Sequence, residues 1–235
     1  FNNYFGNSCS SFVTLSKSVA NEIKLNFSKP ILKGFHPINE FLPVPISKIE
    51  ARKNLNLSSN ASYILFFGLI RKYKGLDLLI DAFSIYQKKN KNAYLLIVGE
   101  FYENKNKYLR QIDNLGLKNK VVLYPEFMDS DQARNFFCAS DCVAQTYRSA
   151  SQSGVTPLSY HYGLPILVSN LNGLIKPIKN DDSGIITEIN STSIAKGLNE
   201  ILQPKSLIKF KKNIQSSRSN YSWKKFNQRM IHFIE

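Results

Sequence analysis

Two loops of the sequence carry residue types that can bind a diphosphate. The first, residues 68–75, has a glycine at each end and holds Arg71 and Lys74 directly before a helical segment. Glycine lets the backbone turn tightly, Arg can grip a phosphate with two parallel hydrogen bonds, and Lys adds a point charge. Taken alone, this basic loop fits a phosphate site and an ordinary connection with exposed cations equally well.

The second loop, residues 146–156, is small and hydroxylated, and Arg148 is its only charged residue. It leads into a helix whose open N–H groups could bind an anion, and Gly154 permits a close approach. Pro157 suits the first turn of that helix, where its missing N–H would be unpaired anyway. A helix start capped by serine is the alternative interpretation of this serine loop. Together, however, the two loops describe a diphosphate pocket.

The segments that must position these loops alternate between short apolar strands and longer amphipathic helices. The expected strands are residues 63–67, 94–98, 120–124, 142–145 and 165–168, and the expected helices are residues 76–86, 104–115, 129–139 and 153–162. This alternation predicts an α/β fold with an open, doubly wound parallel sheet covered on both faces. Ligands bind beyond the carboxyl ends of the strands in such a sheet, which is where both loops begin.

The two ends of the chain have a different pattern. Residues 11–27 form a single strand–helix unit, and residues 35–46 contain three prolines and should be an extended linker. We therefore expect residues 1–45 to be a remnant of a preceding domain plus a linker, and residues 46–202 to be the doubly wound domain. Because the first residue is not Met, we expect the chain to be a fragment or one subunit of a split protein.

Residues 203–235 should be basic helices. A stretch within them, residues 205–235, holds eight Lys or Arg and one acidic residue. Its net charge of +7 is therefore half of the +14 of the whole chain. Such a tail favours peripheral contact with an anionic membrane, and a solvated helix face fits equally well. An apolar stripe along its last helix would pack on another element, so we expect no nucleic-acid partner. The stripe consists of Trp223, Phe226, Met230 and Phe233.

Metal and membrane classes have little support in the sequence. Cys138 and Cys142 are four residues apart, but no histidine lies near them and buried small side chains explain them better. Three cysteines in all argue against a disulfide framework and for a reducing, cytoplasmic compartment. The longest apolar stretch, residues 63–70, is far shorter than the roughly 20 residues that cross a bilayer. The chain also begins without the pattern of a signal peptide.

Five spaced motifs resemble those of bacterial GT4-type (group 1) glycosyltransferases, which are retaining enzymes of the GT-B fold with two Rossmann-like domains. The longest is residues 66–77, FFGLIRKYKGLD. The others, in the order of the family, are Ile97–Glu100, Ser140–Val143, Ser151–Val155 and Gly163–Ile166. The resemblance covers about residues 12–202. It implies that residues 46–202 are the nucleotide-sugar-binding half, that the N-terminal remnant belongs to the acceptor domain, and that the helix after Ser222 crosses back toward that domain.

The resemblance also implies roles for particular residues. Arg71 and Lys74 would hold the donor diphosphate and stabilise the leaving group. Further donor and phosphate contacts would come from Gly68, Ser151, Gln152, Ser153, Gly154, Val155 and Thr156. The loop Glu126, Phe127 and Met128 would cover the nucleotide base. No metal or other cofactor is expected, because protein cations would take the leaving-group charge.

The function implied is transfer of a sugar, with retention, from a nucleotide-diphosphate sugar to a glycan or lipid-linked acceptor. The setting would be bacterial cell-surface polysaccharide synthesis at the inner face of the membrane, and a separate chain could supply the acceptor domain. Commoner family members carry a pair of glutamates around the serine loop, and no acid stands at residues 150–151 or 158–159 here. The alternative is therefore a non-catalytic module that binds a nucleotide or a glycan.

Overall fold

Six parallel strands form the central sheet, in the order β5-β4-β3-β6-β7-β8. The computed structural model describes residues 2–235. The strands are β3 (Ser62–Phe67), β4 (Ala93–Val98), β5 (Val121–Tyr124), β6 (Cys142–Gln145), β7 (Ile166–Ser169) and β8 (Gly184–Thr187). The chain builds outward from β3 to one edge and then returns to β6 to build the other edge, so the order reverses between β3 and β6. This is the doubly wound α/β fold that the sequence predicts.

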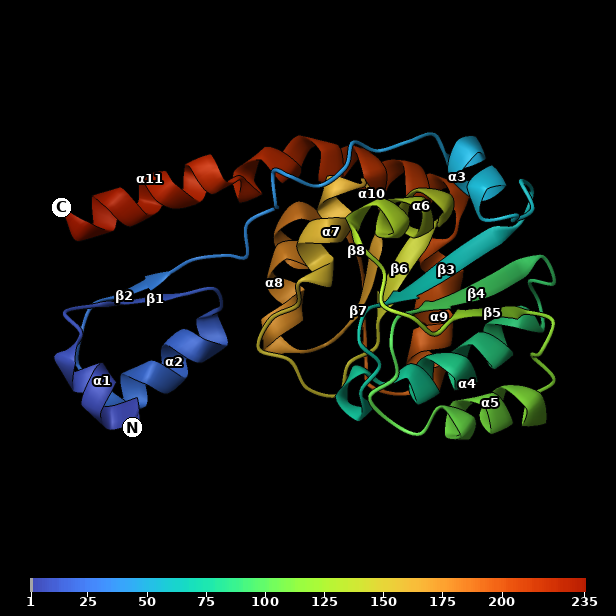
Figure 1. Cartoon of the computed structure of the whole chain (residues 1–235), viewed down its shortest axis with the longest axis horizontal. Coiled ribbons are helices and arrows are strands. Elements are labelled where there is room, and N and C mark those ends of the chain that lie inside the picture. The colour runs from blue at the N-terminus through green and yellow to red at the C-terminus, as the bar shows by residue number, and fades with distance from the viewer. Residues whose placement is uncertain (1) are drawn as a thin grey trace.

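Helices cover both faces of this sheet (Figure 1). Side chains alternate along β3: Ile64 and Phe66 face one core, whereas Tyr63 and Leu65 face the other. The first core is closed by α4 (Leu76–Gln87), α5 (Lys105–Asn114) and α9 (Ser191–Ile201). The second is closed by α6 (Ser130–Ala139), α7 (Val155–His161) and α8 (Asn172–Asp181).

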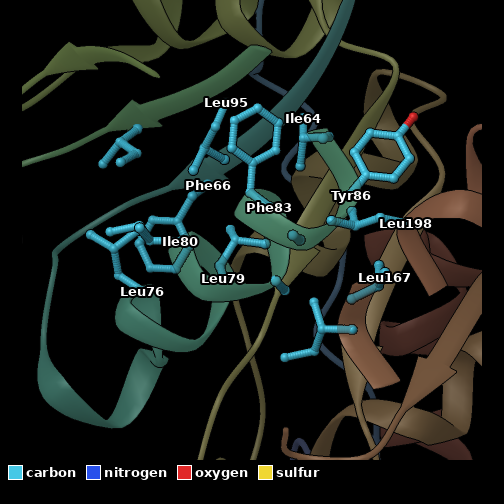
Figure 2. Packing of buried hydrophobic residues seen from close by; sticks show 14 of the residues in the cluster. Ile64, Phe66, Leu76, Leu79, Ile80, Phe83, Tyr86, Leu95, Leu167 and Leu198 are labelled. Carbon is cyan, nitrogen blue, oxygen red and sulfur yellow. The ribbon is translucent and has the colours of Figure 1, made fainter. Parts of the chain in front are cut away.

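The first core shows why periodicity predicts this part of the chain. Leu79, Ile80 and Phe83 lie at helical spacing on α4 and are fully buried. They pack against side chains of β3 and β4, among them Phe66 and Leu95 (Figure 2). The apolar stripe of the helix and the apolar run of each strand therefore bury one another.

The predicted bounds agree with the structure to within two residues for the nine expected elements of the sheet region. The helix after the serine loop starts at Val155 rather than residue 153, because Gly154 occupies its N-cap position. Five elements within residues 46–202 are not predicted from the sequence, namely α3 (Lys48–Asn54), the 3₁₀ turn Lys72–Lys74, α8, β8 and α9. Of these, α8 carries an internal Pro177 that argues against a helix.

The N-terminal residues form a small unit of their own. It consists of α1 (Asn2–Ser8), β1 (Phe12–Thr14), α2 (Lys17–Asn26) and β2 (Ile31–Lys33), and its two strands pair in parallel. Neither α1 nor β2 is expected from the sequence. The following segment, residues 34–46, contains no helix or strand and leads to α3 (Lys48–Asn54), which packs on α6.

The C-terminal helices connect the two parts. α10 (Pro204–Ser217) packs on α8 and α9, and after the short η2 (Arg218–Tyr221) the chain continues as α11 (Trp223–Ile234). Figure 1 shows α11 reaching from the sheet region toward the N-terminal unit. The Phe226 ring lies 5.7 Å from that of Phe35, and Arg229 Nη2 donates to the carbonyl of Lys33 at 2.8 Å. Phe226 is the buried member of the predicted apolar stripe, whereas Trp223 is half-exposed.

Candidate functional site

The basic loop leaves the carboxyl end of β3 in a conformation that two glycines make accessible. Gly68 has φ 97° and Gly75 has φ 64°, and both lie in the region that L side chains rarely adopt. Between them, residues Lys72–Lys74 form one turn of 3₁₀ helix. A Cβ on Gly75 would stand 2.1 Å from the carbonyl oxygen of Thr146. Gly75 therefore lets the basic loop and the serine loop touch.

The two loops are also tied by polar contacts, because β3 and β6 are neighbours in the sheet. The Arg148 amide donates to the carbonyl of Tyr73 at 2.6 Å, and Thr146 Oγ1 donates to that of Gly75 at 3.0 Å. The Arg148 guanidinium binds both carboxylate oxygens of Asp77, at 2.7 and 2.8 Å. Burial alone would raise the pKa of Asp77, but the hydrogen bonds and charge of Arg148 lower it. Arg148 is thus neutralised within the protein and joins the loops.

Lys74 is the buried cation of the site. Only 8% of the residue is exposed, and its Nζ lies 3.0 Å from where a Cβ on Gly68 would be, so Gly68 leaves room for the ammonium. The ammonium is 5.7 Å from the centroid of the Tyr147 ring. Within residues 2–235, no side chain forms an ion pair or a hydrogen bond with it. Burial, and then the charge of Arg71, lower the pKa of Lys74 to about 8.

Arg71 lies beside Lys74 but is exposed. Its guanidinium stands over the ring of Tyr102, 4.8 Å from the centroid. Tyr102 follows β4, so side chains from the ends of two adjacent strands meet here. Arg71 and Tyr102 both line a shallow pocket with Lys72, Tyr73, Glu103 and Arg148. Arg71 and Lys74 therefore give this edge of the sheet two cations that no carboxylate of the described residues pairs with.

The serine loop lies next to Lys74 and opens onto a larger cavity. The Tyr147 hydroxyl is 3.3 Å from Ser153 Oγ, which accepts a hydrogen bond from the Val155 amide at 3.2 Å. Gln152, Ser153 and Thr156 line a cavity of about 620 Å³. The backbone at the start of α7 thus faces a hollow that can admit a ligand.

The remaining predicted positions are placed differently. Ser151 is exposed, and its carbonyl accepts a hydrogen bond from Ser18 Oγ of the N-terminal unit at 3.4 Å. Glu126, Phe127 and Met128 follow β5, which β4 separates from β3, and they line neither pocket. Phe127 is 72% exposed. The structure therefore brings the two predicted loops together, and the 126–128 loop follows the carboxyl end of β5 at the same edge of the sheet, two strands from β3.

Three residues of the site are not predicted from the sequence. Tyr102 supports Arg71, and Tyr147 links Lys74 to Ser153. His36 lies opposite Gly154, where an added Cβ would be 3.8 Å from His36 Nε2. Tyr147 stands inside the serine loop and could have been found there by its aromatic type. Nothing in the sequence signals that His36, more than a hundred positions away, reaches the same place.

The described residues contain neither a membrane-spanning helix nor a cluster of metal ligands. Across residues 2–235, no helix is long and apolar enough to cross a membrane. The side chains described there form no group of three or more His, Cys, Asp and Glu that could hold a metal ion. Cys138 and Cys142 are buried, as expected for small core side chains, and burial raises the pKa of both thiols.

The sequence profile described as "Glycosyl transferases group 1" matches residues 47–217. An uncharacterized glycosyltransferase of Methanocaldococcus jannaschii is 28% identical over 199 residues, which is 81% of this chain and 50% of that protein. Spore coat protein SA of Bacillus subtilis is 25% identical over 236 residues, covering 93% of this chain and 60% of that protein. The chain thus spans about half to three fifths of the length of these curated relatives.

Solved structures resemble the chain closely in fold. Sucrose-phosphate synthase from Thermosynechococcus elongatus superimposes with a TM-score of 0.83 at 15% identity, covering 99% of this chain and 59% of that one. The HepE protein of Anabaena, solved in complex with UDP, has a TM-score of 0.81 at 18% identity, covering 100% of this chain and 68% of that one. The C-terminal domain of a group 1 glycosyltransferase from Francisella tularensis has a TM-score of 0.66 at 19% identity, covering 77% of this chain and 96% of that domain.

Proposed function

This chain belongs to the group 1 glycosyltransferase family, and from that premise we propose that it binds a nucleotide-diphosphate sugar and transfers the sugar, with retention, to a glycan or lipid-linked acceptor. The diphosphate would lie between the basic loop and the serine loop, at the carboxyl ends of β3 and β6. Ligands of doubly wound sheets bind where the strand order reverses, and the order of this sheet reverses between β3 and β6.

The observation that carries the proposal is the buried, unpaired ammonium of Lys74. A charge taken out of water without a partner is costly, so proteins rarely keep one unless a ligand supplies the counter-charge. A diphosphate beside Lys74 and Arg71 would supply it. The cluster also lies where the two family motifs meet, at residues 66–77 and 151–155.

The same two cations suit the chemistry of sugar transfer. When the bond between the anomeric carbon and the phosphate oxygen breaks, negative charge develops on the departing nucleoside diphosphate. Lys74 and Arg71 would stabilise that charge in a partly dehydrated site, an electrostatic role that needs no metal ion. The amides of Gly154, Val155 and Thr156 at the start of α7 would hold the distal phosphate, and Gly68, Ser151, Gln152 and Ser153 would shape the site around it. The 126–128 loop would cover the nucleotide base.

We also propose a division of labour along the chain. Residues 46–202 would be the donor domain, residues 1–45 a part of the acceptor domain and its linker, and residues 203–235 a return to that domain. The contact between Phe226 and Phe35 supports this division. The exposed lysines of α10, together with Ile208, would let a cytoplasmic protein of polysaccharide synthesis touch an anionic membrane.

A panel of nucleotides tests the donor site. The Anabaena HepE protein has been solved with UDP-glucose, so we expect UDP and UDP-glucose to raise the melting temperature more than GDP, ADP or CMP. At 100 times the dissociation constant a ligand stabilises a protein by about 2.7 kcal/mol. No shift with any nucleoside diphosphate would contradict the proposal. Sugar transfer in the presence of an acceptor then separates an enzyme from the alternative, a non-catalytic binding module, which would bind UDP without turnover.

The lowered pKa of Lys74 predicts how UDP binding depends on pH. Bound diphosphate favours the ammonium, so it raises the pKa of Lys74 above the value of about 8 in the free protein. Affinity should be constant below about pH 8 and fall above it, by up to about tenfold per pH unit until the pKa of the complex is reached. Calorimetric titrations between about pH 7 and about pH 9.5 measure this dependence. Lys74→Arg keeps its charge throughout, and an equally steep fall in that variant would assign the effect to another group.

A further inference from the structure

The cavity of about 620 Å³ lies where the N-terminal unit faces the sheet region. Its lining comes from the residues between β1 and α2 and the start of α2, from the segment after β2, from the serine loop, and from α7, α8, η2 and α11. In Figure 1 the N-terminal unit stands opposite α7 and α8, and α11 runs between the two parts along the top of the view. The cavity therefore lies between two parts of the fold and is not enclosed in the core of either.

The lining of this cavity is strongly cationic. Lys17, Lys176, Lys225 and Arg229 line it, and within the described part of the chain none of the four forms an ion pair. Lys225 binds the side-chain oxygen of Asn220 and Arg229 the carbonyl of Lys33, which are neutral partners. The cavity thus carries positive charge that the protein itself does not neutralise.

One carboxylate lines the same cavity, and it is already engaged. Asp181 Oδ2 accepts hydrogen bonds from the hydroxyls of Tyr160, at 2.7 Å, and Tyr221, at 2.5 Å. The acidic side chain therefore serves to connect α8 to α7 and η2. With two hydroxyls on one of its oxygens, it offsets at most one of the four cationic charges around the hollow.

The position of the cavity identifies which substrate it suits. Gln152, Ser153 and Thr156 line it, and they belong to the loop that we assign to the distal phosphate of the donor. A molecule in the cavity would meet the sugar end of the donor rather than the nucleotide end. That is where an acceptor has to be held if its hydroxyl is to reach the anomeric carbon.

We propose, on the basis of the function proposed above, that this cavity binds the acceptor and that the acceptor is a sugar bearing a phosphate or carboxylate group. Four unpaired cations around one cavity favour an anion by charge alone. A neutral sugar would leave those cations without counter-charge. The volume is of the size that small-molecule sites in proteins have.

Calorimetric titration with three probes tests this assignment: glucose 6-phosphate, glucuronate and glucose, each with and without saturating UDP. We expect both anionic sugars to bind at least about tenfold more tightly than glucose. The variant Lys17→Gln/Lys176→Gln should weaken binding of glucose 6-phosphate by at least about tenfold and leave the affinity for UDP within about twofold. Neither side chain has a hydrogen-bonding partner in the described structure, so this variant should fold normally.

The control variant is Lys88→Gln/Lys196→Gln, which removes the same charge from exposed sites outside the cavity. It should bind glucose 6-phosphate as the unchanged protein does.

Two results would overturn the proposal: equal affinity for glucose and glucose 6-phosphate, or an unchanged affinity for glucose 6-phosphate in Lys17→Gln/Lys176→Gln. The proposal would also be overturned if glucose 6-phosphate competed with UDP and Lys74→Ala no longer bound glucose 6-phosphate, because the anion would then occupy the donor site. Binding of UDP without binding of any anionic sugar would support the donor function and contradict this inference. Binding of anionic sugars without binding of UDP would contradict the donor function and leave the cavity assigned to an anionic sugar.

Discussion

Replacing Lys74 with Met should lower the affinity for UDP about 100-fold and, at the same time, make the unliganded protein more stable. The ammonium is buried and has no anionic partner in the described structure. A bound diphosphate would give the Lys74 ammonium an anionic hydrogen-bond acceptor. Hydrogen bonds to charged groups contribute about 1.5–3 kcal/mol each. A loss of about 2.7 kcal/mol in binding free energy corresponds to the 100-fold change.

The gain in stability follows from the sign of the pKa shift. A lysine whose pKa falls from 10.5 to about 8 on folding is held in a place that disfavours its charged form. The folded state is therefore destabilised at pH 7, and this penalty disappears only as the pH rises from about 8 toward the unfolded value. Met is of similar length and uncharged, so Lys74→Met should raise the free energy of unfolding by about 1–3 kcal/mol at pH 7. The gain should shrink above about pH 9.

Lys72→Met is the matched control for this experiment. Lys72 lies in the same turn of 3₁₀ helix, but its side chain is exposed. We expect small changes in both UDP affinity and urea unfolding for this variant. If Lys74→Met binds UDP as well as Lys72→Met does, the donor site does not use Lys74, whatever happens to stability.

The part of this structure that local pattern determines was predictable. The apolar run of β3 ends at Gly68 and the next apolar stripe begins at Leu76, so the basic loop had to connect a strand to a helix. The same reasoning applies to the serine loop after β6. Because both strands are parallel and central, the two loops had to meet at one edge of the sheet. The diphosphate interpretation required only that placement.

Contacts between distant parts of the chain could not be predicted in this way. Arg148, the only charged residue of the serine loop, binds Asp77, which stands 71 positions earlier. The cavity collects residues from both ends of the chain, from Leu15 to His232. The return of the helix after Ser222 to β2 is implied by the family resemblance but by no spacing rule in the sequence, because tertiary packing determines where that helix lies.

One of the five family-like motifs is structural in this chain. Asp141, in the motif Ser140–Val143, is 7% exposed and stands at the amino end of β6, away from the basic loop. Its Oδ2 accepts hydrogen bonds from Arg52 Nη2 at 3.0 Å and from the Tyr63 amide at 2.8 Å. Its Oδ1 pairs with Lys48 at 2.5 Å. A single carboxylate thus fastens α3 and the start of β3 to β6.

Asp141→Ala should therefore destabilise the protein by about 3–5 kcal/mol, which is the usual cost of removing one partner from a buried ion pair. The cost arises because Arg52, only 5% exposed, would keep its charge without a carboxylate. The Tyr63 amide would lose its acceptor as well. Urea unfolding at neutral pH measures the change. Asp131→Ala is the matched control, since Asp131 pairs with Arg134 at 3.4 Å but its side chain is 76% exposed, and exposed pairs contribute at most about 1 kcal/mol.

A double variant isolates the unpaired charge as the cause. In Arg52→Met/Asp141→Ala the buried guanidinium is gone, so the double variant should be more stable than Asp141→Ala alone. This is expected although it has lost two more native hydrogen bonds, from Arg52 Nε to the Ala139 carbonyl and from Arg52 Nη1 to the Ser59 carbonyl. If the double variant is instead the less stable of the two, the lost contacts of Asp141 and not the stranded charge of Arg52 account for the destabilisation. Neither variant touches the basic or serine loops, so UDP affinity of the folded protein should be unchanged in both.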